Sequence, residues 1–285
     1  LEVLNKTHLH HHSKSLVSVV VPKPAASEEQ KQKIAKVREV IREEAWCKDV
    51  EIIESGVNKG LARSVTEGVT HTVEKYGKVI VLEDDLFPDV WFLKFMNDSL
   101  NMYEHDVDVA CISGYIYPVK EPLPETFFLK GADCWGWATW KRGWDLFDSD
   151  GKALLQELKD KNLGYDFSIY NSYPYMEMLQ DQIDKKNNSW AILWYASTYL
   201  KNKHILYPGK SLIQNIGVDG SGIHSAISTN FDVVFYGQEI PLKKIKVIED
   251  TKAKKIIADY FTDIYKTPPL PFSRRFINCI KRILR

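Results

Sequence analysis

Three consecutive carboxylates, Glu83-Asp84-Asp85, are the residues whose type and spacing point most directly to chemistry. They follow an apolar run at residues 79–82, and such a run without alternation is typical of a strand buried on both faces of a parallel sheet. Neighbouring negative charges repel one another unless a cation lies between them. Carboxylate oxygens favour Mg²⁺ or Mn²⁺, which a substrate's phosphates often share. The alternative interpretation is a solvated acidic loop before a helix that begins near Pro88.

The elements around these carboxylates alternate between strand and helix. The patterns predict strands at residues 16–21, 50–54, 79–82 and 109–113, and helices at residues 27–45, 60–76 and 88–103. Such alternation predicts an α/β fold with a doubly wound, mostly parallel sheet and helices on both faces. In sheets of this kind ligands bind outside the carboxyl ends of the strands, where the three carboxylates would lie.

The second half of the chain has a different pattern, in which aromatic residues, prolines and glycines dominate from residue 115 to about residue 144. Helices are predicted at residues 152–161, 174–185 and 190–201, with a short strand at 205–207, and residues 215–224 are rich in glycine. No repeat or low-complexity linker interrupts the chain. We therefore expect one catalytic domain, with a nucleotide-binding half at residues 1–114 and an acceptor-binding half at residues 115–265.

Residues 266–285 form a basic amphipathic tail, in which apolar residues recur at helical spacing between arginines and lysines. Such a helix can lie in an anionic membrane interface, and docking on its own domain is the alternative. No apolar stretch approaches the ~20 residues of a membrane span. The four cysteines are far apart, which is typical of free thiols in a reducing compartment. We expect a cytoplasmic protein, with peripheral contact at the inner face of the plasma membrane as a further possibility.

The overall composition excludes one class of partner. The 285 residues carry a formal net charge of zero, which argues against a nucleic-acid binder that relies on overall charge. Tryptophan is concentrated at Trp135, Trp137, Trp140 and Trp144. These rings either fill a core or stack on sugar rings, and Gly136 would allow a close backbone approach. Asp133 is a candidate for a further polar contact.

Six motifs in series resemble one family. They are Glu83-Asp84-Asp85 and the segments at residues 58–62, 112–115, 134–140, 189–192 and 207–224. Together, over nearly the whole chain, they resemble bacterial sugar transferases related to glycosyltransferase family 2, which have a GT-A fold. The chain is similar, more distantly, to N-acetylglucosaminyltransferases that carry a Glu-Asp-Asp motif.

The resemblance implies metal-dependent transfer of a sugar, with inversion, from a nucleoside-diphosphate sugar to an acceptor hydroxyl of a cell-surface polysaccharide, glycan or lipid-linked acceptor. It implies that Asp85 contacts Mn²⁺ or Mg²⁺, which stabilises the leaving diphosphate. It implies that Asp84 holds the ribose, the donor sugar or a metal-bound water, and that Glu83 supports them. His224 matches a position that supplies another metal ligand or a diphosphate contact; an ordinary loop histidine is the alternative.

The resemblance also implies which residues bind the substrates. Asn58 would lie beside the nucleotide, although an asparagine there can equally cap the following helix. Arg63 would contact phosphate or base, because its guanidinium matches phosphate geometry; the alternative is a surface residue. Trp135, Gly136, Trp137 and Trp190 would complete the substrate site.

The sequence departs from the family's pattern in three places. The chain begins at what resembles the first helix, so the family's first strand is expected to be missing. Residues 22–24 are Pro-Lys-Pro where the family has a Ser-Asp-Gly turn. Asn188 stands where the family has the aspartate that acts as general base, and an asparagine cannot accept that proton. Asp181 or Asp184 could substitute. The alternative function is therefore a weakly active or non-catalytic relative that binds sugar, nucleotide or a partner.

Overall fold

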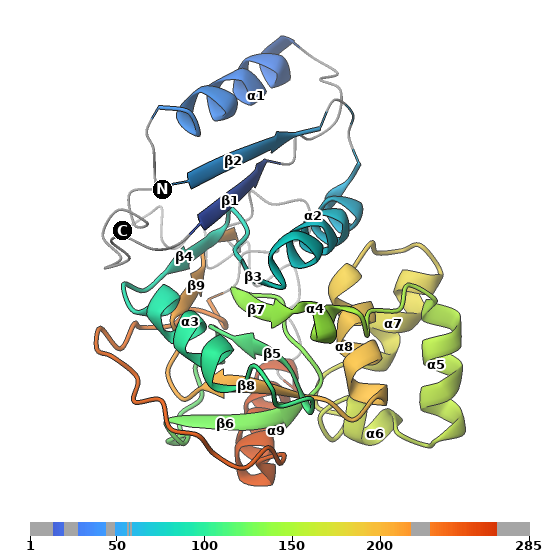
Figure 1. Ribbon diagram of the computed structural model, residues 1–285. Coiled ribbons are helices and arrows are strands. Elements are labelled where there is room, and N and C mark those ends of the chain that lie inside the picture. The colour runs from blue at the N-terminus through green and yellow to red at the C-terminus, as the bar shows by residue number, and fades with distance from the viewer. Residues whose placement is uncertain are drawn as a thin grey trace, which may run out of the picture.

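The computed structural model describes residues 14–19, 28–43, 49–55, 57, 59–217 and 229–266, and they form a mixed α/β protein (Figure 1). Its central sheet has five strands in the order β3-β7-β5-β8-β6. The bounds of these strands are β3 Lys78–Val81, β5 Val109–Ser113, β6 Thr126–Lys130, β7 Trp137–Trp140 and β8 His204–Pro208. The expected strands at residues 79–82, 109–113 and 205–207 are therefore confirmed as β3, β5 and β8.

The prediction of a mostly parallel sheet is wrong. β7 lies between β3 and β5 and runs antiparallel to both, with Trp137 opposite Val81 on one side and Ser113 on the other. β6 is antiparallel to β8, so β5 and β8 are the one parallel pair among the described strands of this sheet. The physical reason is that β7 is only four residues long and lies inside the aromatic segment. Nothing in its local sequence marks it as a strand or gives its direction.

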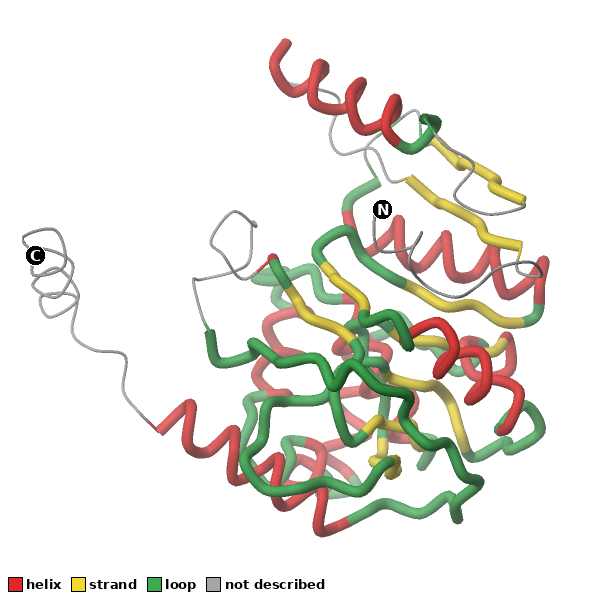
Figure 2. The backbone as a smooth tube through the Cα atoms, turned by 90° about the vertical axis from the view of Figure 1, so that its left-hand side faces the viewer, coloured by secondary structure: helices red, strands yellow, loops and turns green. Residues whose placement is uncertain are grey.

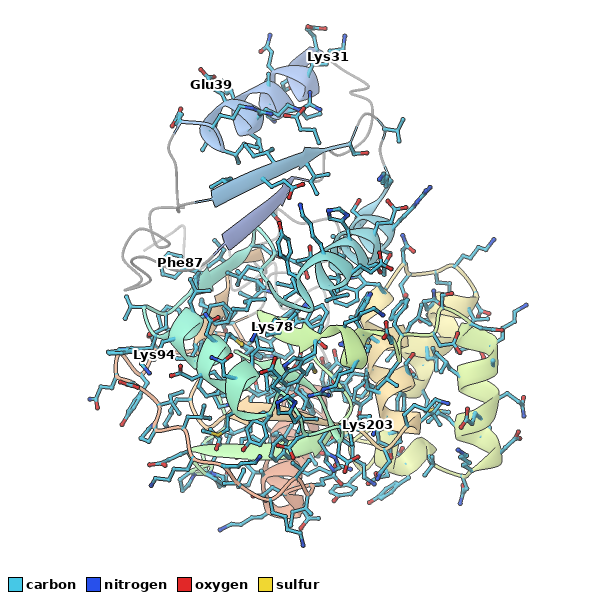
Figure 3. All side chains as sticks on the ribbon, viewed as in Figure 1. Lys31, Glu39, Lys78, Phe87, Lys94 and Lys203 are labelled. Carbon is cyan, nitrogen blue, oxygen red and sulfur yellow. The ribbon has the colours of Figure 1, made fainter. Side chains whose placement is uncertain are left out.

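Two small sheets accompany the central one. β1 (Lys14–Val19) pairs in parallel with β2 (Asp49–Glu54), and β4 (Leu86–Pro88) pairs antiparallel with β9 (Ile213–Asn215), as the tube in Figure 2 shows. Pro88 was expected to open a helix, but it ends β4, where an edge strand tolerates the missing N–H. The outward-facing Phe87, which is labelled in Figure 3, is 43% exposed. Its ring stacks on that of Phe235.

Helices cover both faces of the central sheet. On one face α3 (Phe92–Met102) buries Phe92 and Met96 completely. On the other face lie α2 (Leu61–Tyr76), α8 (Trp190–Leu200) and α9 (Thr251–Lys266), whose apolar side chains share one core with β7. The remaining described helices are α1 (Glu28–Val40), α4 (Lys141–Trp144), α5 (Gly151–Asp160), α6 (Gly164–Phe167) and α7 (Tyr175–Ile183). The predicted covering of both faces is thus confirmed.

The tryptophan cluster forms part of this core. Trp137 on β7 contacts Trp144, Trp190 and Trp194, with ring centroids 5.5–6.0 Å apart. Trp137 is fully buried and Trp190 is 4% exposed. The rings therefore join β7 to α8, and this packing fixes where α8 begins relative to the sheet edge.

None of the described helices is long and apolar enough to cross a membrane. Of the predicted basic tail, Lys266 ends α9, and residues 267–285 lie outside the described residues. Residues 22–24, where the sequence departs from the family's turn, also lie outside them.

Candidate functional site

The three carboxylates lie at one edge of the central sheet. β3 ends at Val81, at the edge where β5 ends and β7 begins. Leu86 donates its N–H to the carbonyl of Glu83 at 3.2 Å, which closes a tight turn after the strand. Ile216 donates its N–H to the carbonyl of Asp85 at 2.8 Å, so the acidic turn is fastened to the chain that leaves β9.

The electrostatics of this turn are unfavourable without a cation. Burial, together with the negative charges of Asp85 and Asp84, raises the pKa of Glu83 to about 7. Burial and the charge of Asp84 raise the pKa of Asp85 as well. No described lysine, arginine or histidine forms an ion pair with any of the three carboxylates. The turn therefore holds negative charge that its described surroundings do not neutralise.

Asp85 lies against a glycine that leaves no room for a side chain. A Cβ atom at Gly217 would lie 2.5 Å from Oδ2 of Asp85, and the N–H of Gly217 is held by Oδ1 of Asn215 at 2.8 Å. The sequence signal for this close approach is the glycine-rich stretch at residues 215–224. Residues 218–228 lie outside the described residues, so the role of His224 stays a prediction.

The donor atoms at this edge fit a hard divalent cation in part. Within the described ranges, no group of three or more histidine, cysteine, aspartate or glutamate side chains is arranged to hold a metal ion. Mg²⁺ in proteins, however, is commonly bound through one or two carboxylates together with substrate phosphates and waters. Asp85, with Glu83 or Asp84, would hold a cation of this kind, and a bound diphosphate would supply further oxygens.

Two helices begin beside each other near this edge. Gly60 precedes α2 with φ 73°, and a Cβ atom there would lie 4.0 Å from the side-chain nitrogen of Asn188. Asn188 is exposed and precedes Ser189, whose hydroxyl accepts the N–H of Ile192 and caps α8. The structure thus brings the predicted position 188 close to the start of α2. Asn58 lies outside the described residues.

Two other predicted site residues are held in surface ion pairs. Nε of Arg63 lies 2.5 Å from a carboxylate oxygen of Glu67, one turn further along α2. Asp181 near the end of α7 pairs with Lys186 at 2.9 Å, and Asp184 pairs with the same lysine. Neither Arg63 nor Asp181 has a described hydrogen bond or ion pair with residues 83–85.

The predicted aromatic contacts divide into buried and accessible rings. Trp137 and Trp190 are buried in the core, so they offer no open ring face to a ligand in this conformation. Trp135 is half-buried and makes edge contacts with Tyr115 and Phe231, at centroid distances of 4.7 and 5.8 Å. The adjoining Gly136 has φ 62°, and a Cβ atom there would collide with the side chain of Ile213. The close approach at this glycine is therefore made by a protein side chain, and its role in a sugar site stays a prediction.

Asp133 is a carboxylate that forms no ion pair with any residue the structure describes. It accepts the N–H of Cys134 at 2.7 Å and the hydroxyl of Tyr207 at 2.9 Å, while burial raises its pKa. The next residue, Cys134, links Asp133 to the acidic turn. Burial, together with the negative charges of Asp133, Glu83 and Asp85, raises the pKa of the Cys134 thiol. The sequence indicates Asp133 as a polar residue in an apolar segment, but it gives no signal that Tyr207 is its partner.

Replacing Tyr207 with phenylalanine removes the side-chain donor that holds this carboxylate and leaves the backbone donors of Cys134 and Trp135. We expect the free energy of unfolding at pH 8 to fall by about 1–3 kcal/mol, because a buried charged acceptor loses a hydrogen bond. Urea unfolding followed by circular dichroism measures the change. Tyr165→Phe is the matched control, because Tyr165 is 60% exposed and its hydroxyl has no described partner; its effect should stay within about 0.5 kcal/mol. Equal losses in the two variants would contradict this account of Asp133.

Fold and site together define an α/β protein with an uncompensated acidic turn at the edge of a mixed sheet. No protein-family model matches the sequence, and no curated protein matches it. The functional argument therefore rests on the geometry and electrostatics of this edge.

Proposed function

We propose that this protein is a metal-dependent glycosyltransferase that moves a sugar from a nucleoside-diphosphate sugar to an acceptor hydroxyl. The observation that carries the proposal is the acidic turn after β3, where burial and mutual repulsion raise the pKa of Glu83 to about 7. A divalent cation that binds between carboxylates crowded in this way stabilises them, because it offsets their mutual repulsion. A nucleoside diphosphate supplies the remaining oxygen ligands, and the metal stabilises the negative charge of the leaving diphosphate.

Two features beside the turn support a nucleotide-sugar as the ligand. The N-terminus of α2 lies near this edge and has no acidic residue in its first turn, so its dipole favours a negative group. The half-buried indole of Trp135 is an apolar surface of the kind that sugar rings contact. Because the general-base position holds Asn188, the second candidate is a relative that binds the donor without transferring the sugar.

Calorimetric titration of UDP, GDP and dTDP, each with and without Mn²⁺, tests the donor site. We expect one nucleotide to bind in the micromolar range with Mn²⁺, and at least about tenfold more weakly when EDTA replaces the metal. Binding without release of free sugar from the matching nucleotide-sugar would favour the non-catalytic candidate. Failure of all three nucleotides to bind with Mn²⁺ would overturn the proposal.

A further inference from the structure

The segment that precedes β7 crosses the carboxyl ends of two central strands. The first residue of β7 lies opposite the last residues of β3 and β5, between which β7 runs (Figure 1). Gly114, directly after β5, donates its N–H to the carbonyl of Gly136 at 2.7 Å. Residues 133–136 therefore lie along the same edge of the sheet as the acidic turn, and they include the carboxylate of Asp133.

The charge of the acidic turn reaches this segment. After burial and the charge of Asp133, the negative charges of Glu83 and Asp85 contribute to the raised pKa of the Cys134 thiol. Cys134 follows Asp133 directly and donates its N–H to an oxygen of that carboxylate at 2.7 Å. Asp133 is therefore a neighbour of the site at which the proposed donor would lose its diphosphate.

The carboxylate of Asp133 is fixed in direction but is not neutralised. It accepts the backbone N–H groups of Cys134 and Trp135, and its second oxygen accepts the hydroxyl of Tyr207 at 2.9 Å. These three donors are all uncharged. A carboxylate offers about four acceptor positions, so one position remains for a further donor. Asp133 is thus held in one orientation and keeps the capacity to accept a proton.

Tyrosines from two parts of the chain surround Asp133. After burial, the negative charge of Asp133 contributes to the raised pKa of Tyr117, which follows β5, and of Tyr173 and Tyr175 near the start of α7. All three side chains are half-buried, and the rings of Tyr173 and Tyr175 lie 4.5 Å apart. Aromatic faces with hydroxyl groups beside them are a surface of the kind that sugar rings contact. An acceptor sugar would therefore find contacts next to Asp133.

The other described carboxylates near this edge are less suited to accept a proton. The three of the acidic turn would be engaged by the cation. Asp181 and Asp184 both pair with Lys186, at 2.9 and 3.2 Å. Asp232 is exposed and accepts the side-chain amide of Gln214 at 3.1 Å.

We propose that Asp133 is the general base of the transfer, in place of the carboxylate that position 188 lacks, and that it takes the proton of the acceptor hydroxyl. The inference deepens the proposed function and rests on it. The proton passes from the hydroxyl to Asp133, the acceptor oxygen bonds to the anomeric carbon of the donor sugar, and the bond between that carbon and the diphosphate breaks. The products are the glycoside, the nucleoside diphosphate and protonated Asp133, which returns its proton to water.

Release of nucleoside diphosphate from nucleotide-sugars, with water as the acceptor, tests the inference. The donors carry the nucleotide that binds best in calorimetry, joined to glucose, galactose, mannose, rhamnose or N-acetylglucosamine, at saturating Mn²⁺. We expect the unaltered protein to turn over one or more of them, and Asp133→Asn to lower the rate at saturating donor by about 10²–10⁴-fold. The donor KM and the calorimetric nucleotide affinity should stay within about twofold, because the variant keeps the donor site.

Asp232→Asn is the matched control. Asp232 and Asp133 both contribute to the raised pKa of Tyr115, so the two aspartates lie in the same region, but Asp232 is exposed. We expect Asp232→Asn to keep the turnover of the unaltered protein within about twofold. Equal losses in the two variants, or a loss in Asp232→Asn alone, would overturn the assignment.

The pH dependence of turnover distinguishes a base from a structural carboxylate. A base acts in its ionised form, so the rate at saturating Mn²⁺ should rise with pH through the pKa of Asp133, which burial raises. The hydrogen bond from Tyr207 lowers that pKa, so Tyr207→Phe should move the rise to higher pH. A rise at the same pH in Tyr207→Phe and in the unaltered protein would contradict the inference.

The other ionisable groups described around Asp133 do not account for such a rise, because burial raises the pKa of each above its ordinary value. These groups are Cys111, Tyr117, Cys134, Tyr173, Tyr175, Tyr195 and Tyr207.

Nucleotide binding to the same samples separates this inference from the proposed function. If the unaltered protein binds a nucleotide with Mn²⁺ but turns over no donor, the donor site stands, the inference fails and the non-catalytic candidate is favoured. If Asp133→Asn turns over donor as fast as the unaltered protein, the proposed function stands and Asp133 is not the base. If no nucleotide binds, the proposed function itself fails.

Discussion

Replacing Asp85 with alanine is expected to abolish Mn²⁺-dependent nucleotide binding, with a loss of affinity of at least about 100-fold. Replacing a residue that only contacts a metal ligand typically lowers metal affinity by about 10–100-fold, so removing a direct ligand should lower it further. Calorimetry with the nucleotide that binds best, at fixed Mn²⁺, measures the loss. Unchanged affinity would remove Asp85 from the proposed site.

The same variant should have the opposite effect on the metal-free protein. Without a cation, the negative charge of Asp85 repels that of Glu83 and raises its pKa. Removing the Asp85 carboxylate relieves this repulsion and should raise the free energy of unfolding in EDTA. Asp98→Ala is the control. Asp98 pairs with Lys94 of α3, which is labelled in Figure 3. Loss of the Asp98 carboxylate should change neither the nucleotide affinity nor the free energy of unfolding by more than about 0.5 kcal/mol.

Stability of the metal-free protein should decrease as the pH rises from about 4.5 to about 7, through the titration of Glu83. Its pKa is raised from 4.5 to about 7, so over this interval the folded state binds the proton more tightly than the unfolded state. The contribution of Glu83 to the free energy of unfolding is therefore fully present below pH 4.5, and it is lost as the pH rises through the pKa of the folded state. The rise of the pKa from 4.5 to about 7 corresponds to a loss of about 3 kcal/mol in the free energy of unfolding once Glu83 is ionised.

Glu83→Gln tests this pH dependence directly. We expect the variant to be more stable than the unaltered protein by up to about 3 kcal/mol at pH 8 in EDTA, with the difference vanishing near pH 4.5. Urea unfolding across this pH range provides the measurement. Glu177→Gln, on the exposed surface of α7, should leave the curve unchanged. A Glu83→Gln curve parallel to that of the unaltered protein would contradict the assignment.

Mn²⁺ should reverse the pH trend in the unaltered protein. A bound cation favours the ionised form of the carboxylates, so metal binding releases a proton below pH 7 and its affinity should rise as the pH increases toward 8. The stability gained from a fixed excess of Mn²⁺ should therefore be larger at pH 8 than at pH 5.5. Equal gains at the two pH values would indicate that the cation binds away from Glu83.

The fold could be predicted from the sequence where hydrophobic patterns are long or follow helix signals. The apolar runs of β3 and β5 and the periodicity of α2 and α8 were sufficient to predict those elements. The direction of the strands could not be predicted in this way, because it is set by pairing partners distant in the chain. The four residues of β7 carry no turn signal that would show them returning between β3 and β5. Pro88 gave a helix signal that the pairing of β4 with β9 overrode.

The candidate site could be predicted only where charge itself was the signal. Glu83-Asp84-Asp85 is visible in the sequence because three adjacent carboxylates are costly to place together. The burial of Trp137 and Trp190 could not be predicted, because a tryptophan in either segment is equally compatible with a core and with a sugar site.

The position of β7 also bears on how the chain folds during synthesis. β3 is complete when residue 81 leaves the ribosome, yet the strand that joins it to β5 ends only at Trp140. Until then β3 and β5 have no hydrogen-bonded neighbour in the sheet between them. Contacts this distant in sequence slow folding, and exposed strand edges favour aggregation. A nascent chain that pauses before residue 137 should therefore depend on chaperones, and fragments that end at residue 114 should be insoluble when expressed alone.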